Sequence, residues 1–296
     1  MTFAGVYPIL YAFFGADGQL DEGAMRSQVR ACLASGAHGI AVLGLITEVG
    51  KLSSEERRAV VSWAADEVRG RVPLAVTIAG PDISTQIEDA RIAQSLGADL
   101  VIFQPPGDCW DEKDLMRAFG HAADALDHSV GIQNAPQYLG KGIGVDAIRD
   151  LHRQHPNFCV LKGEASAVEI AKVVDQCGDG LAVFNGRGGL ELPDILRAGC
   201  VGMIPAPECC DVQIRIFDAF QLGQFEKADA LYAEALPLIT FVMQSIDASL
   251  IYGKRITARR LGLSGVVDRG NDLTPTPFGS QIAEARSAFL GPFPLE

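Results

Sequence analysis

The stretch Phe158-Cys159-Val160-Leu161-Lys162-Gly163-Glu164 ends an apolar run with a lysine and a glutamate. It predicts a buried β-strand, and because strand side chains alternate between faces, Lys162 and Glu164 should point the same way. A lysine in an apolar strand is costly unless it is paired or has a chemical role. Burial lowers the pKa of a lysine and can leave the amine neutral, which a Schiff-base nucleophile requires. The alternative is a strand-end lysine that is solvated or salt-bridged to a neighbour.

Similar apolar runs recur along the chain and indicate an α/β fold. They alternate with amphipathic segments, and several are apolar throughout, as in strands buried on both faces. The strand candidates are Gly5–Tyr11, Gly39–Gly44, Leu74–Ala79, Leu100–Gln104, Val130–Ala135, Phe158–Glu164, Leu181–Asn185 and Val201–Pro205. This repetition over residues 1–222 predicts a (β/α)8 TIM barrel. A doubly wound open sheet is the alternative, but no G-x-G-x-x-G turn follows the first strand.

Residues 223–296 show a different pattern, which predicts a C-terminal extension of helices. The predicted helices are Phe225–Met243, Ile246–Leu261 and Pro277–Leu290. The apolar stripe expected on the first helix consists of Phe225, Ala228, Tyr232, Leu236, Ile239 and Met243. We expect these helices to pack on the barrel or on another subunit.

Composition excludes several classes of partner. The 296 residues are 48% hydrophobic with a formal net charge of -12, so a large core is expected and no basic stripe is present to bind nucleic acid. No apolar run reaches the roughly 18 residues of a membrane span, and no signal peptide is expected at the N-terminus. The seven cysteines show no C-x-x-C spacing, so we expect reduced thiols, no metal site and a cytoplasmic protein.

Polar residues cluster at the predicted C-terminal ends of the strands, where chemistry gathers in barrels of this kind. A purely structural barrel has little need of a lysine, a glutamate, a glutamine and an arginine at one mouth. The polar strand-end residues are Glu48, Gln104, Gln133, Asn134, Lys162, Glu164, Arg187 and Glu208.

Three of these strand ends together carry a family resemblance. They are the Gly44-x-x-x-Glu48 turn, the Asn134-x-Pro136 turn and Lys162. With them, the chain resembles the dihydrodipicolinate synthase / N-acetylneuraminate lyase family of class I aldolases over nearly its whole length. The resemblance implies a Schiff base between Lys162 and the keto carbon of pyruvate or a related 2-keto acid, formed without a cofactor or a metal. It also implies a homo-oligomer, either a tetramer or a dimer.

Departures from the family's pattern reduce the number of family activities that are expected for this chain. Gln133 stands where the family usually has a proton-relaying tyrosine, and glutamine cannot exchange protons near neutral pH. Leu45 and Ile46 replace the paired hydroxyls that help to hold the substrate carboxylate, which leaves the backbone N–H groups of that turn to bind it. Tyr138 stands where dihydrodipicolinate synthase has an arginine for its aldehyde substrate. Dihydrodipicolinate synthase activity itself is therefore not expected.

With the tyrosine absent, Glu164 is the natural group to move protons beside Lys162. A Lys-x-Glu strand with Gln133 next to it is similar to the 2-keto-3-deoxy-L-arabonate dehydratase branch of the family. The Asn185-Gly-Arg-Gly-Gly turn and the Gly202-Met203-Ile204-Pro205 strand also look like that branch. This resemblance implies a hydro-lyase for a 2-keto-3-deoxy sugar acid.

The predicted site follows from that reaction. Lys162 would form the imine, Glu164 would remove a C3 proton, and Gln133 would orient substrate or water. The predicted substrate-binding residues are Leu45, Ile46, Asn134, Gly186, Arg187 and Pro205.

Two alternative functions stay open. A retro-aldol reaction starts from the same iminium but cleaves the C3–C4 bond and releases pyruvate. A barrel that has lost a proton relay can also keep binding and lose turnover, which would make the chain a non-catalytic keto-acid-binding protein. The Lys162 and Glu164 pair argues against the second alternative, since a mere binder gains little from a buried amine.

Overall fold

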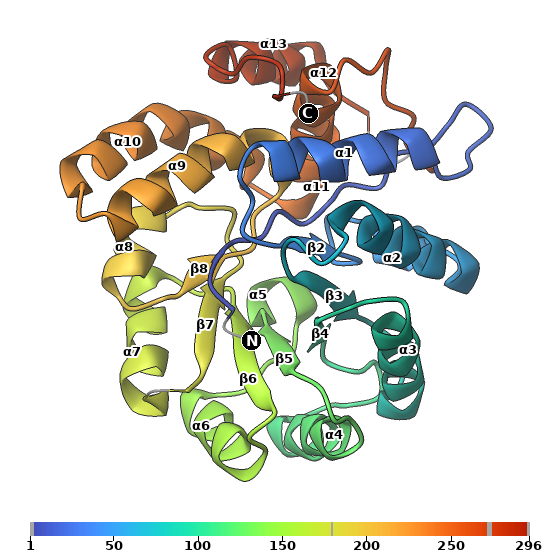
Figure 1. Ribbon diagram of the computed structural model, residues 1–296, viewed down its shortest axis with the longest axis vertical. Coiled ribbons are helices and arrows are strands. Elements are labelled where there is room, and N and C mark those ends of the chain that lie inside the picture. The colour runs from blue at the N-terminus through green and yellow to red at the C-terminus, as the bar shows by residue number, and fades with distance from the viewer. Residues whose placement is uncertain (1–2, 179, 271–273, 295–296) are drawn as a thin grey trace.

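In the computed structural model, which describes residues 3–178, 180–270 and 274–294, parallel strands form one curled sheet (Figure 1). Their order in the eight-stranded sheet of the described residues is β1-β8-β7-β6-β5-β4-β3-β2. The strands are β1 (Gly5–Val6), β2 (Ile40–Val42), β3 (Leu74–Ile78), β4 (Leu100–Phe103), β5 (Val130–Asn134), β6 (Phe158–Gly163), β7 (Ala182–Asn185) and β8 (Gly202–Met203). The predicted (β/α)8 barrel is confirmed.

The first predicted strand is shorter than expected, and its remainder closes the barrel. Pro8 has no N–H to give to a ladder, so β1 ends at Val6. The chain returns to the sheet at Ile9, which forms a parallel bridge with Ala41 of β2. The neighbouring backbone bonds, from Leu10 N to Ala41 O and from Ala41 N to Pro8 O, are both 3.0 Å long. The strand predicted over Val201–Pro205 is likewise reduced to β8.

Helices follow the strands and cover the outside of the barrel. The α2 helix begins with a capping box, in which the Ser53 hydroxyl accepts from Glu56 N and the Glu56 carboxylate accepts from Ser53 N. The helices of the barrel are α1 (Glu22–Ala34), α2 (Ser54–Val68), α3 (Ile83–Ser95), α4 (Glu112–Asp124), α5 (Pro136–Leu139), α6 (Val145–Gln154), α7 (Ala167–Cys177), α8 (Leu192–Arg197) and α9 (Cys210–Gln221), with the short turns η1 (Val49–Lys51) and η2 (Pro207–Cys209).

The C-terminal helices gather along one side of the barrel, as the orange and red ribbons of Figure 1 show. The second predicted helix of this region is interrupted by a turn of π-helix. The elements are α10 (Phe225–Val242), α11 (Ile246–Ala248), η3 (Ser249–Gly253), α12 (Lys254–Arg260) and α13 (Pro277–Arg286). The α10 helix packs on α9, so packing on the barrel is confirmed.

The predicted apolar stripe of α10 is only partly correct. Ala228 and Ile239 are buried as expected, but Phe225 is 46% exposed. The buried face continues instead through Ala235 and Leu238. The reason is that α10 packs against α9 on one side and against α13 and η3 on another, which a single stripe does not describe.

No single helix of the described residues is long and apolar enough to cross a bilayer. The helices of Phe225–Val242 and Ile246–Arg260 satisfy the length and composition test only as a pair, and they are bent by 108°.

The interior of the barrel is filled by side chains and supports the site above it. Tyr7 and Phe184 meet edge to face with ring centroids 5.1 Å apart, and Val160 packs in the same cluster. Val160 shares a strand face with Lys162, so the apolar filling gives way to polar side chains toward the C-terminal ends of the strands.

Glu208 lies outside the polar mouth expected for strand-end residues. It is buried, its Oε2 accepts a 3.0 Å hydrogen bond from the Tyr11 hydroxyl, and its backbone carbonyl accepts from Arg260. Burial raises the pKa of Glu208 above its ordinary value, while the Tyr11 bond and Arg260 oppose the shift.

We predict that Glu208→Gln stabilises the protein more at alkaline pH than at acid pH. Because the folded state holds the Glu208 proton more tightly than the unfolded state does, stability falls as pH rises above the ordinary carboxyl pKa. The amide keeps an acceptor for Tyr11 and cannot ionise. Melting temperatures of both proteins between about pH 4 and about pH 8 test this. A difference in melting temperature between the two proteins that stays constant across this pH range would contradict the prediction.

Candidate active site

The Lys162 amine and the Glu164 carboxylate meet inside the barrel mouth. Lys162 Nζ lies 3.1 Å from Glu164 Oε1, and their side chains are only 5% and 4% exposed. Lys162 is paired in register with Gln133 on β5 and with Phe184 on β7. The predicted placement of both side chains on one face is confirmed.

Gly186, at the end of β7, leaves the space that Glu164 occupies. A Cβ atom at Gly186 would lie 2.8 Å from Glu164 Oε1 and 2.7 Å from its Cγ. Any larger residue would therefore displace the carboxylate. The backbone of Glu164 is fixed by bonds from its N–H to Asn134 O and from Gln137 Nε2 to its carbonyl.

Two buried glutamines, Gln133 and Gln104, continue from Glu164 as a row of hydrogen-bonded polar side chains across the neighbouring strands. Gln133 Nε2 donates to Glu164 Oε1 at 2.5 Å, and Gln104 Nε2 donates to Gln133 Oε1 at 2.9 Å. Gln104 is 5% exposed and Gln133 is 1% exposed. Gln104 follows β4 directly, so the row crosses three adjacent strands of the barrel.

The pocket around Lys162 is polar on one side and apolar on the other. Gln133, Tyr138, Lys162 and Glu164 supply the polar wall. The apolar lining comes from Ile9, Leu45, Ile46, Ile204 and Ala206. Leu45, Ile46 and Gly186 of the predicted binding set thus lie at the pocket, together with the predicted catalytic residues.

Three of the predicted substrate-binding residues do not line this pocket: Asn134, Arg187 and Pro205. Asn134 and Pro205 follow inward-facing residues and so point to the opposite face of their strands. The Asn134 side chain bonds the backbone of Ile143 in both directions, at 2.9 and 3.0 Å. Arg187 Nη1 donates to Glu191 at 2.5 Å.

Tyr138 contributes a hydroxyl that the sequence marked only as a departure from the family's pattern. Burial, followed by the charge of Glu164, raises the pKa of Tyr138, while Arg187 opposes the shift by its charge and a hydrogen bond. Arg187 therefore acts on the pocket through Tyr138. The hydroxyl is protonated near neutral pH and can donate a proton.

The C-terminal helices also contribute to the pocket, which the sequence did not predict. Met243, Ile246 and Ser249 line it. A Cβ at Gly188 would lie 2.4 Å from Met243 Sδ, so Met243 packs directly against the turn after β7. We call Met243, Ile246 and Ser249 the roof of the pocket. No local pattern could have revealed this contact, because it joins residues more than 50 positions apart.

The turn after β2 is held in a strained conformation beside the pocket. Leu43 and Glu48 have φ angles of 64° and 54°, in the left-handed region. Lys254 Nζ lies 2.8 Å from Glu48 Oε1, and both side chains are essentially fully buried. This ion pair ties the turn to α12. No hydrogen bond within the described residues uses the N–H of Leu45 or Ile46.

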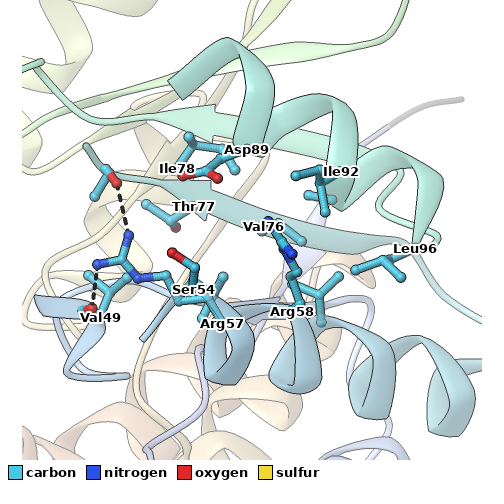
Figure 2. Close-up of a pocket in the computed structure, with 14 residues that line it drawn as sticks. Val49, Ser54, Arg57, Arg58, Val76, Thr77, Ile78, Asp89, Ile92 and Leu96 are labelled. Carbon is cyan, nitrogen blue, oxygen red and sulfur yellow. Dashed lines mark hydrogen bonds between the residues drawn. The ribbon is translucent and has the colours of Figure 1, made fainter. Parts of the chain in front are cut away.

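A second pocket lies outside the barrel, between α2 and α3 and against β3 (Figure 2). Arg57 spans it and donates to Val49 O at 3.0 Å and to Ala79 O at 3.4 Å. None of the predicted site residues lines it. We assign Arg57 a bracing role, since it joins the segment after β2 to the end of β3.

The part of the chain that the structure describes holds no group of three or more His, Cys, Asp or Glu side chains arranged to bind a metal ion. The scattered cysteines are free thiols.

Comparison with known proteins places this geometry in a family. The sequence profile of the dihydrodipicolinate synthetase family matches residues 2–267. The 4-hydroxy-tetrahydrodipicolinate synthase of Methanoculleus marisnigri is 29% identical over 245 residues, which cover 80% of this chain and 83% of that protein. YagE of Escherichia coli, named as a candidate 2-dehydro-3-deoxy-D-gluconate aldolase, is 30% identical over 167 residues, or 56% and 55% of the two chains.

Solved structures share the fold. Dihydrodipicolinate synthase from Thermotoga maritima matches with a TM-score of 0.90 at 18% identity, over 97% of this chain and 98% of that one. The enzyme from Rhodopseudomonas palustris gives a TM-score of 0.88 at 22% identity over the same shares. By the extent of the profile match, this chain belongs to the dihydrodipicolinate synthetase family.

Proposed function

We propose that this Schiff-base lyase dehydrates a 2-keto-3-deoxy sugar acid such as 2-keto-3-deoxy-L-arabonate. The observation that carries the proposal is the buried contact between Lys162 Nζ and Glu164 Oε1, with Gln133 where a proton-relaying group is usual. An amine and one carboxylate suffice for imine formation and C3 deprotonation. The branch resemblance of the Lys162-x-Glu164 strand supports the choice of substrate.

The proposed reaction begins when the Lys162 amine attacks C2 and water leaves, giving an iminium. The iminium accepts electrons and acidifies C3, and Glu164 removes a C3 proton to give an enamine. The enamine expels the C4 hydroxyl, which takes up a proton and leaves as water. Hydrolysis returns the lysine, and tautomerisation of the product places an aldehyde at the former C5 alcohol. The net change is the loss of one water, with no oxidant or reductant.

Two side chains of the pocket, Glu164 and Tyr138, are the candidates for proton transfer in this reaction. Gln133 holds Glu164 but cannot exchange protons itself. Glu164 can return the C3 proton to the leaving hydroxyl, directly or through water. Tyr138 provides a second hydroxyl on the same pocket wall, and this hydroxyl is protonated near neutral pH.

The substrate carboxylate would bind at the turn after β2. The side chains of Leu45 and Ile46 line the pocket, and their N–H groups make no hydrogen bond within the described residues. Successive backbone N–H groups of this kind form anion sites. The proposal further includes a barrel of residues 1–222, a helical region of residues 223–296, a cytoplasmic location and a homo-oligomer, tetramer or dimer.

A pyruvate-releasing aldolase is the second candidate. The specific observation in its favour is the 30% identity to YagE over 167 residues. It needs a base at the C4 hydroxyl in place of one at C3, and Glu164 and Tyr138 both lie in the same pocket. A non-catalytic keto-acid binder is a third possible outcome of the tests below.

Reductive trapping tests the covalent step. Pyruvate should form an imine with Lys162, and borohydride should reduce that imine to a stable secondary amine. Lys162→Arg should abolish the adduct, because its guanidinium stays protonated. Peptide mass mapping locates the label. Lys141→Arg is the control, since Lys141 Nζ bonds the carbonyls of Pro106 and Gly107 and does not line the pocket. An unlabelled Lys162 in the parent protein would remove the basis of the mechanism.

Product analysis over a small panel of 2-keto-3-deoxy acids separates the reactions. We expect 2-keto-3-deoxy-L-arabonate to give a semialdehyde and no pyruvate, because loss of the C4 hydroxyl leaves the carbon chain intact. Pyruvate together with a shorter aldehyde would establish the aldolase instead. Trapping without any consumption of substrate would indicate the binding protein.

Glu164→Gln should separate imine formation from turnover. The amide keeps the shape of the side chain but cannot accept a proton, so turnover should fall by roughly 10²–10⁴-fold while pyruvate is still trapped at Lys162. Glu208→Gln is the matched control, because Glu208 is a buried carboxylate outside the pocket. Undiminished turnover in Glu164→Gln would assign the proton transfer to another group.

A further inference from the structure

Gln104 contacts a residue of the site, Gln133, but does not line the pocket. It does not belong to the pocket wall, yet its amide nitrogen lies 2.9 Å from Gln133 Oε1, and Gln133 in turn contacts Glu164. All three side chains are at least 95% buried, so water cannot easily replace a missing partner.

The row of hydrogen bonds has a fixed direction. An amide has a donor end and an acceptor end, whereas a carboxylate only accepts. With the NH2 group of Gln133 on Glu164, its carbonyl faces Gln104 and needs a donor, which the Gln104 NH2 group supplies. A reversed Gln133 would place its carbonyl against the carboxylate and bring two NH2 groups together.

We infer that Gln104 is a positioning residue, which holds Gln133 in the orientation that donates to Glu164 and thereby keeps the Glu164 carboxylate beside Lys162. This inference rests on the proposed function in so far as it treats Glu164 as the base. Besides Lys162, the charged and titratable groups around Glu164 include Tyr138 from the turn after β5, which lines the same pocket, and Arg187 from the turn after β7, which contacts Tyr138.

The test compares Gln104→Leu, which has no donor, with Gln104→Glu, which keeps the shape of glutamine. Gln86→Leu and Gln86→Glu are matched controls, because Gln86 is fully buried on α3 and its amide bonds Gly80 O outside the site. Two quantities are measured for each protein across about pH 5 to 9: the rate of pyruvate trapping at Lys162 and the kcat for the 2-keto-3-deoxy acid.

Gln104→Leu should lower kcat by about tenfold to a hundredfold with little change in KM, since Gln104 does not line the pocket but misplacement of a reacting group is costly. In Gln104→Glu the introduced carboxyl donates to Gln133 only while it is protonated. As it ionises with rising pH it becomes an acceptor, and the Gln133 amide turns away from Glu164. The kcat should therefore approach that of the parent protein at low pH and fall relative to it as pH rises. The rate of trapping should depart from that of the parent protein over the same pH range, because the carboxylate leaves the Lys162 amine.

The Gln86→Glu control distinguishes positioning from a general effect on folding, because it also introduces a buried carboxyl, and pH-dependent destabilisation alone would lower the rates of both variants. Parent-like rates and pH profiles in both Gln104 variants would overturn the inference, as would equal losses in the Gln86 controls. If the parent protein traps pyruvate but consumes no 2-keto-3-deoxy acid, the proposed function fails while the trapping profile of Gln104→Glu still decides the role of Gln104. Absence of trapping in the parent protein would overturn both.

Discussion

The contact between the Lys162 amine and the Glu164 carboxylate, above the apolar cluster that fills the barrel, is the constraint on which the rest of the site depends. Removing two charged groups from water is costly unless their geometry is good and their other polar atoms find partners. The neighbouring strands meet this requirement in different ways. Strand β6 places both groups on one face, β7 is followed directly by Gly186, which leaves space, and β5 supplies the Gln133 amide. A reactive pair can therefore be buried only where the register of the three strands is correct.

A second buried ion pair holds the turn after β2, which forms one edge of the pocket, in place. Lys254 and Glu48 join α12 to the turn after β2, where two non-glycine residues adopt left-handed backbone conformations. Such conformations persist only when the surrounding structure holds them in place. The Thr47 hydroxyl adds a bond to Leu10 O at 2.7 Å. The C-terminal helices thus help to shape the part of the pocket at which a substrate carboxylate would bind.

Most of the fold could be predicted from sequence because continuous apolar runs mark parallel strands strongly. The same alternation rule placed Lys162 and Glu164 together, and it could have warned that Asn134 and Pro205 face away from their pocket-lining neighbours. What sequence could not supply depends on contacts distant along the chain. The pocket contact of Met243 and the Lys254–Glu48 pair arise from packing of the C-terminal helices on the barrel, and the π-helical turn at Ser249–Gly253 lies between two of those helices. Gln104 was visible as a strand-end residue, but only the structure shows its contact with Gln133.

Because Met243 packs directly on Gly188, a residue of the C-terminal helices forms part of the pocket surface. The side chains to which we assign the proposed covalent chemistry lie on or next to the strands, whereas part of the surface above them belongs to helices encoded more than 50 residues later. Substitutions in the later segment can reshape the space available to a substrate's far end without disturbing the lysine, the carboxylate or their register. Under the proposed function, reaction type and substrate range would be encoded in separable stretches of one chain, and laboratory recombination of C-terminal segments could alter one while leaving the other intact.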